Sequence, residues 1–258
     1  MIRIAADPNN LPFSNEKLEG FENKIAALVA KDLNADLEYV WRAQRRGFFR
    51  HALKDAEADL VLGAPAGFDR ALTTPPYYRS TYVFVARPGT EGAKVRSLDD
   101  PLLKWLKVGV QLIGDDGANT PPAHALAARG AVDNLVGFTV YGDYAEPNPP
   151  ARIVSAVAKG DVDVAVVWGP LAGYFAGKQD VPLQLTPVSP EADAGGLRFT
   201  FSIAMGVQKP DKALRDELAG ALERRRAEVG RILDEYHVPR LPSAARPASR
   251  PAEARDAK

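Results

Sequence analysis

The chain has 258 residues, enough for one large domain or two small ones with real cores. Its 33 basic residues balance its 33 acidic residues, so net charge indicates neither nucleic acid nor an anionic membrane as a partner. Cysteine is absent, which excludes disulfides and cysteine nucleophiles, and no stretch reaches the roughly 18 apolar residues of a membrane span.

The opening stretch joins an apolar strand to a polar loop. The strand begins at Ile2 and runs into Asp7-Pro8-Asn9-Asn10, and Gly20-Phe21-Glu22 then begins a helix that Asn34 ends. In open α/β sheets, ligands bind at the carboxyl ends of strands, which makes this loop a candidate site. The alternative is an ordinary connection whose Asp and Asn side chains only cap and turn the chain.

Strands and helices alternate through the rest of the first third of the chain, which favours a parallel sheet. Residues 64–74 break the periodicity, and the segment 87–92 loses it again, so we expect a lobe boundary near residue 90. The predicted elements are strands at 37–41, 59–63 and 81–86, a helix that carries Phe49, Ala52 and Leu53 inward, and an aromatic corner at Pro75-Pro76-Tyr77-Tyr78.

The second part of the chain repeats this alternation. The strand at 198–207 would return the chain toward the first lobe, and 210–238 keeps helical spacing. The tail 239–258 is rich in Pro, Ala, Ser and Arg, so we expect it to be disordered. The remaining predicted elements are a short helix through Trp105, a strand at 107–113 followed by the polar loop 114–120, a helix at 121–130, and strands at 138–141 and 183–188.

One pattern occurs twice in the chain. Ala52-Leu53 followed by 57–62 recurs as Ala156-Val157 followed by 161–166, an offset of 104 residues. Each copy reads as a helix end, an acidic-x-Asp turn and a buried strand. The recurrence late in two successive βαβ runs predicts two similar lobes rather than one sheet.

The residues that an enzyme needs are missing from the sequence. His51, His124 and His237 are far apart in sequence and have no zinc-type spacing. There is no Gly-x-Ser-x-Gly elbow, and the glycines of 109–117 fit neither a dinucleotide fingerprint nor a P-loop. The sequence therefore predicts no catalytic residues, no metal and no cofactor.

Several motifs together resemble the type II periplasmic solute-binding proteins of amino-acid ABC transporters. They are Asp7-Pro8-Asn9 with Pro12-Phe13, Gly20-Phe21-Glu22, Asp59 before an apolar run, Arg70, and Pro76-Tyr77-Tyr78. The resemblance covers nearly the whole chain to about Val238. The run from Ala6 to Asn15, with Leu18 to Glu22, is similar to one branch, the MxaJ/XoxJ proteins associated with quinoprotein methanol dehydrogenases.

This resemblance implies an α/β fold of two lobes, each a mostly parallel sheet flanked by helices, joined by a two-stranded hinge. The first lobe would comprise 1–90 plus 192–238 and the second 91–191. It also implies export to the periplasm, so we expect that an export segment has been removed before Ile2. We expect a monomer with no membrane span and no nucleic-acid partner.

The chain departs from the family at the amino-acid site. In the family, an Arg at the position of Arg70 clamps the ligand carboxylate. Here Pro65 removes a backbone donor, Asp115 and Asp116 would repel a carboxylate, and Trp168 replaces the acidic partner of the ligand amine. The alternatives are a core aromatic for Trp168 and a surface ion pair of Arg70 with Asp69 or Glu22.

These departures predict a remodelled cleft rather than an amino-acid site, because losing a buried charge partner costs several kcal/mol. A small apolar ligand or a peptide segment of a partner could occupy it. The predicted cleft residues are Asp7, Asn9, Asn10, Phe13, Pro65, Arg70, Tyr77, Tyr78, Asp115, Asp116 and Trp168.

The resemblance and the altered site lead to a functional expectation. We expect a non-enzymatic periplasmic accessory protein that binds a methanol dehydrogenase containing pyrroloquinoline quinone, the lanthanide-dependent XoxF type first of all, and aids its folding, maturation or activation. The alternative is a transport receptor for a small molecule other than an amino acid. A degenerate enzyme of the same fold is disfavoured for want of an acid and a base.

Overall fold

The computed structural model describes residues 1–45, 47–113, 119–139 and 144–242. Within these ranges ten strands form one continuous, curled sheet, and a separate pair, β2 (Asn9–Asn10) and β3 (Ser14–Asn15), forms a small hairpin. The sheet strands are β1 (Ile2–Ala6), β4 (Leu37–Trp41), β5 (Leu60–Pro65), β6 (Leu72–Thr73), β7 (Tyr78–Ala86), β8 (Val108–Leu112), β9 (Leu135–Thr139), β10 (Val164–Trp168), β11 (Gln184–Pro187) and β12 (Thr200–Val207).

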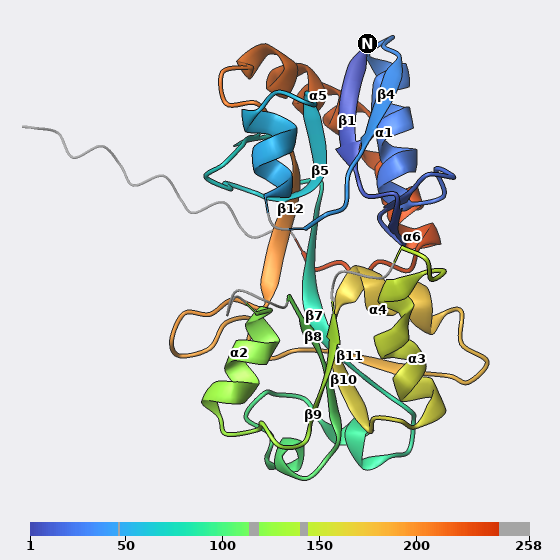
Figure 1. Ribbon diagram of the computed structural model, residues 1–258, viewed down its shortest axis with the longest axis vertical. Coiled ribbons are helices and arrows are strands. Elements are labelled where there is room, and N and C mark those ends of the chain that lie inside the picture. The colour runs from blue at the N-terminus through green and yellow to red at the C-terminus, as the bar shows by residue number, and fades with distance from the viewer. Residues whose placement is uncertain (46, 114–118, 140–143, 243–258) are drawn as a thin grey trace, which may run out of the picture.

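The helices fall into two groups around this sheet (Figure 1). The first group lies with β1, β4 and β5, and the second lies with β8, β9 and β10. The α-helices are α1 (Phe21–Asp32), α5 (Lys212–Arg224) and α6 (Arg226–Glu235) in the first group, and α2 (Pro121–Ala128), α3 (Arg152–Lys159) and α4 (Gly169–Ala176) in the second. Short 3-10 helices occur at Glu91–Lys94, Pro101–Lys104 and Pro149–Ala151.

Two long strands connect the groups. β4, β1 and β5 are parallel to one another, and so are β10, β8 and β9. Between them β12 is antiparallel to β5, and β7 is antiparallel to both β12 and β10. The predicted α/β fold is therefore confirmed, but β7 and β12 join the two sets of parallel strands into one mixed sheet, where the sequence predicted two separate sheets. No helix in the described ranges is long and apolar enough to cross a bilayer.

β7 changes its partners halfway along its length. Its residues 78–81 pair with β12, whereas 82–86 pair with β10. Its burial is almost complete, as expected for a strand covered on both faces. The pairing changes between Thr81 and Tyr82, while the division of the chain near residue 90 stays a prediction.

Two helix predictions need correction. The predicted helix that carries Phe49 is present but short and irregular: it begins at Phe48, and Arg50–Lys54 form a π-helical turn. The single helix expected at 210–238 is two helices, because the backbone of Arg225 leaves the helical conformation. Arg224 and Arg225 both form ion pairs of 2.6 Å with Asp32 of α1, so these two arginines tie α5 and α6 to α1.

The internal repeat corresponds to an equivalent hydrogen-bond pattern in each lobe. Asp59 Oδ2 accepts from the backbone N–H of Arg3 at 3.0 Å, and Asp163 Oδ2 accepts from that of Lys107 at 2.7 Å. In both cases the aspartate backbone N–H also donates back to the carbonyl of the same partner, at 2.9 Å. Each aspartate thus fixes the start of its own strand to that of the neighbouring strand.

The segment after α6 crosses from the first group of helices to the second. Ser80 Oγ donates to the carbonyl of Pro239 at 2.6 Å. The backbone N–H of Leu241 donates to the backbone carbonyl of Arg79 at 2.9 Å. Residues 239–242, the start of the tail for which disorder is expected, are therefore bonded to β7. The rest of that tail, 243–258, lies outside the described residues.

Helix α4 lies directly against this segment. A Cβ at Gly173 would overlap the carbonyl oxygen of His237, which is backbone and has little freedom to move. Gly173→Ala should therefore lower the free energy of unfolding by about 1–3 kcal/mol, through overpacking. Urea unfolding of the two proteins measures this difference.

Gly195→Ala is the matched control. Gly195 is exposed, and the atom nearest to a Cβ there is Asp193 Oδ1 at 3.4 Å, an ordinary contact. An equal effect of the two substitutions would contradict the tight contact between α4 and His237.

Candidate functional site

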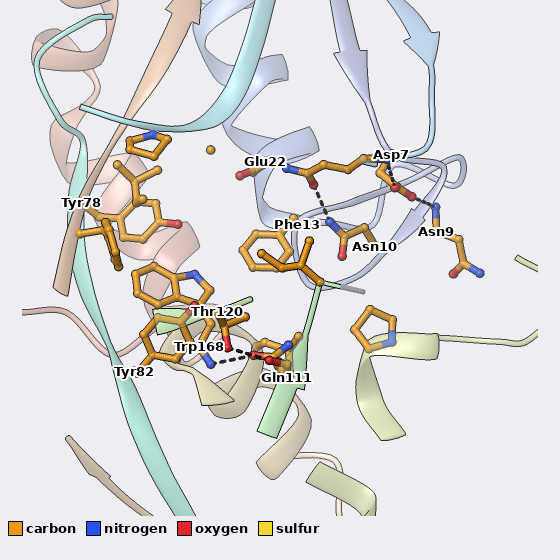
Figure 2. Close-up of a pocket in the computed structure, with 18 of the residues that line it drawn as sticks. Asp7, Asn9, Asn10, Phe13, Glu22, Tyr78, Tyr82, Gln111, Thr120 and Trp168 are labelled. Atoms are coloured by element: carbon orange, nitrogen blue, oxygen red, sulfur yellow. Dashed lines mark hydrogen bonds between the residues drawn. The ribbon is translucent and has the colours of Figure 1, made fainter. Parts of the chain in front are cut away.

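A cavity of about 350 Å³ lies between the two lobes, at the carboxyl ends of β1, β5, β8 and β10 (Figure 2). Asp7 follows β1, Pro65 ends β5, Ile113 follows β8 and Trp168 ends β10. The ends of parallel strands from both sheets therefore meet at one cavity, the position at which open α/β sheets bind ligands.

Most of the predicted cleft residues line this cavity. Their role in binding stays a prediction, and Asp115 and Asp116 lie outside the described residues. The predicted residues that line the cavity are Asp7, Asn9, Asn10, Phe13, Pro65, Tyr78 and Trp168.

Arg70 and Tyr77 do not line the cavity, contrary to the prediction. Arg70 is exposed in the turn that follows β5, where the Gly67 N–H donates to Thr73 Oγ1 at 3.0 Å and closes the loop. In the described structure it forms no ion pair with Asp69 or Glu22. Tyr77 packs against the core of the first lobe, and its buried hydroxyl has no hydrogen-bond partner.

Sequence reasoning missed many lining residues. Two had visible signals: Gln111 is a polar residue in a buried strand, and Glu22 is an acidic residue in the first turn of a helix that follows a strand-end loop. The others come from segments that only the tertiary fold brings together. The missed residues are Glu22, Gln44, Gly63, Tyr82, Gln111, Ile113, Thr120, Tyr144, Pro150, Leu171, Phe201 and Ile203.

The Asp7 carboxylate is saturated by internal hydrogen bonds. It accepts from the backbone N–H of Asn9 at 2.9 Å, from that of Gln44 at 2.6 Å and from the Tyr144 hydroxyl at 2.6 Å. Burial, followed by donation to Asp7, raises the pKa of Tyr144 above its ordinary value. Asp7 therefore fixes the loops around the cavity, which is the capping and turning role weighed from the sequence.

Aromatic side chains form one wall of the cavity. Trp168 packs edge-on against Tyr82, with ring centroids 5.3 Å apart, and against Phe201 at 5.9 Å. Its backbone N–H donates to Gln111 Oε1 at 3.1 Å. Trp168 also packs against the cores of both lobes, so it is both a cavity wall and a core aromatic.

Glu22 is the second carboxylate of the cavity, and in the described structure its side chain has no hydrogen-bond partner. The first turn of α1 is fixed by Asn23 Oδ1, which accepts from the N–H groups of Asn15 and Gly20 at 3.1 Å. A Cβ at Gly63 would lie 2.7 Å from Glu22 Oε1, so the carboxyl group rests on the backbone of β5. Burial raises the pKa of Glu22 to about 8.

No group of three or more His, Cys, Asp or Glu that could hold a metal occurs in the described part of the chain. Asp7 and Glu22 are the charged residues among the described lining residues, and neither Lys nor Arg is among them.

Asp7→Asn should destabilise the protein by about 1–3 kcal/mol, because an amide cannot accept three hydrogen bonds with the strength of a carboxylate. Chemical denaturation of the variant and the parent protein measures this. Asp69→Asn, at an exposed position, is the control and should have little effect. Equal stability of the Asp7 variant and the control would show that the hydrogen bonds to Asp7 do not stabilise the fold.

Glu22→Gln should stabilise the protein more at pH 8.5 than at pH 5. The pKa of Glu22 is about 8 in the folded protein against an ordinary 4.5, so between these values the folded state retains a proton that the unfolded state releases. Its contribution to the free energy of unfolding therefore falls as pH rises, by at most about 1.4 kcal/mol per pH unit. Unfolding curves at both pH values measure the effect.

Glu16→Gln is the control for this experiment, since Glu16 is an exposed glutamate of the preceding loop. The same stability difference between Glu22→Gln and the parent at both pH values would contradict the raised pKa of Glu22.

Known proteins that are similar to this chain are solute-binding proteins or their relatives, in agreement with a cavity between two lobes. The model of the bacterial extracellular solute-binding proteins, family 3, matches residues 2–238. Protein MoxJ of Methylorubrum extorquens is 34% identical over 242 residues, which are 90% of this chain and 79% of MoxJ.

Two solved structures are also similar. The periplasmic binding protein XoxJ from Methylobacterium extorquens AM1 has 35% identity and a TM-score of 0.75, with 94% of this chain and all of XoxJ covered. MxaJ from Methlophaga aminisulfidivorans MPT has 25% identity and a TM-score of 0.80, with 93% of this chain and all of MxaJ covered. The resemblance to the MxaJ/XoxJ branch is confirmed, and the chain belongs to family 3 of the bacterial extracellular solute-binding proteins.

Proposed function

We propose that this protein is a non-enzymatic periplasmic accessory protein of methanol oxidation. It binds a methanol dehydrogenase that contains pyrroloquinoline quinone and aids the folding, maturation or activation of that enzyme. The preferred partner is the lanthanide-dependent XoxF type. The similarity to XoxJ over 94% of this chain carries the proposal.

The cavity supports a role other than amino-acid capture. Arg70, at the position of the family's carboxylate clamp, is exposed and does not line the cavity. No Lys or Arg that could bind a carboxylate is among the described residues that line the cavity. An amino-acid zwitterion would therefore bury its carboxylate without a cationic partner, at a cost of several kcal/mol.

The aromatic wall suits a protein partner. Trp168 and Phe201 are half-buried and line the cavity beside the buried rings of Tyr78 and Tyr82. Aromatic residues anchor interfaces well, so this wall can hold an apolar segment of another protein. Membership of an extracellular solute-binding family supports export, and the relative XoxJ is a periplasmic binding protein.

A second candidate function is that of a transport receptor for a small molecule other than an amino acid. One observation favours it: the cavity is of the size of a small-ligand site and contains a carboxyl group, that of Glu22, that no described residue satisfies. A thermal-shift screen of small neutral, acidic and basic solutes tests it, since a ligand at about 100 times its Kd stabilises by roughly 2.7 kcal/mol.

Deletion of the gene should reduce methanol dehydrogenase activity in the periplasm, because the enzyme would lose a protein that assists it. Activity and the amount of dehydrogenase protein are measured in the deletion strain and after complementation with the parent gene or with Asp69→Asn. In parallel, gel filtration of the purified full chain with the purified dehydrogenase should show a complex. Unchanged activity in the deletion strain, together with no complex at micromolar concentrations, would refute the accessory role.

A further inference from the structure

The two carboxylates of the cavity differ in how they are satisfied. Asp7 accepts three hydrogen bonds from the protein itself. Glu22 lines the same cavity (Figure 2) and accepts none from the described residues. It lies against Gly63, where an added Cβ would be 2.7 Å from Glu22 Oε1. Glu22 is half-buried and lines the cavity, so a ligand there can supply the hydrogen-bond partner that no described residue supplies.

No cation of the described structure is available to Glu22. The titratable groups that face it are tyrosines: Tyr78 at the start of β7, Tyr77 just before it, and Tyr39 on β4. Burial raises the pKa of each. The nearby basic residue of α1, Lys24, pairs with Glu235 at 2.6 Å and lies over the ring of Tyr236. The described residues therefore supply no counter-ion for the ionised form of Glu22, and a ligand in the cavity could supply one.

The surroundings of Glu22 also restrict the shape of that counter-ion. Phe13, Tyr78 and Trp168 line the same cavity, and an ammonium group with an apolar stem gains both from the faces of aromatic rings and from a carboxylate. A carboxylate on the same ligand would meet Asp7 and Glu22, and no Lys or Arg is among the described residues that line the cavity.

We propose that the cleft binds a protonated primary amine on an apolar stem, without a carboxylate, and that Glu22 is its counter-ion. The amine is either a free alkylamine or the side chain of a lysine that a partner protein inserts. The inference rests on the proposed function only in taking the cavity as a binding site, and it does not require that the partner be a methanol dehydrogenase.

Binding of an ammonium group favours the ionised form of Glu22. With a pKa of about 8, Glu22 is mostly protonated at pH 7, so binding there releases a proton to the buffer. If only the ionised form binds, affinity should rise up to about 50-fold between pH 6 and pH 8, while an alkylamine remains protonated like a lysine.

Calorimetric titration of the full chain with n-butylamine tests the proposal, with 1-butanol and butyrate as neutral and anionic probes of the same stem. The amine should bind the parent protein and Glu16→Gln, and Glu22→Gln should weaken binding at least tenfold. Titration at pH 7 in two buffers of different ionisation enthalpy should reveal proton release. Circular dichroism of each variant verifies that it is folded.

Three results would overturn the proposal: no binding of the amine at millimolar concentrations, equal binding of butanol and butylamine, or unchanged affinity of a folded Glu22→Gln variant. The source of the amine is distinguished by competition. If a partner lysine is the natural ligand, butylamine should displace the dehydrogenase from the parent protein. If a free amine is the ligand, both should bind together.

The failures of the two proposals can be told apart. A complex with the dehydrogenase but no amine binding would refute only the amine site. Amine binding without any complex, and with normal dehydrogenase activity in the deletion strain, would refute only the accessory role.

Discussion

A single buried strand, β7, belongs to both lobes, and the position of the cleft depends on it. Tyr78 pairs with β12 and packs in the core of the first lobe, whereas Tyr82 pairs with β10 and packs in that of the second. Both side chains line the cavity. Since successive residues of a strand alternate between its faces, residues four apart lie on the same face, so the strand that joins the lobes also supplies the floor between them.

The chemistry of the cleft follows from how its two carboxylates are used. Asp7 is occupied by two backbone amides and Tyr144, and holds the surrounding loops together. Glu22 lies in the first turn of α1, which the hydrogen bond from Gly20 N–H to Asn23 Oδ1 fixes. Its carboxyl group has no hydrogen-bond partner among the described residues. One acidic residue thus stabilises the loops of the cavity, and the other presents a carboxyl group that no described residue satisfies. Such a difference is typical of binding sites.

The sequence predicts the fold well because local patterns determine it. The repeated acidic-x-Asp turn is a local feature, and Asp59 and Asp163 do occupy equivalent places. The site is harder to predict, because its residues meet only through the tertiary fold: Tyr82 and Phe201 come from strands far apart in sequence. Arg70 lies outside the cavity lining, because a family motif does not specify how the loop after β5 turns.

The close contact of α4 with the segment after α6 affects how the molecule can move. Two strands alone would let the lobes rotate about them, but Gly169 and Gly173 place α4 against a third length of chain, at His237 and Pro239. A rotation that widened the cleft would have to slide the helix across that backbone. These contacts restrict that rotation, so the shape of the cleft is largely set in the free protein, and little binding energy would be lost to ordering it.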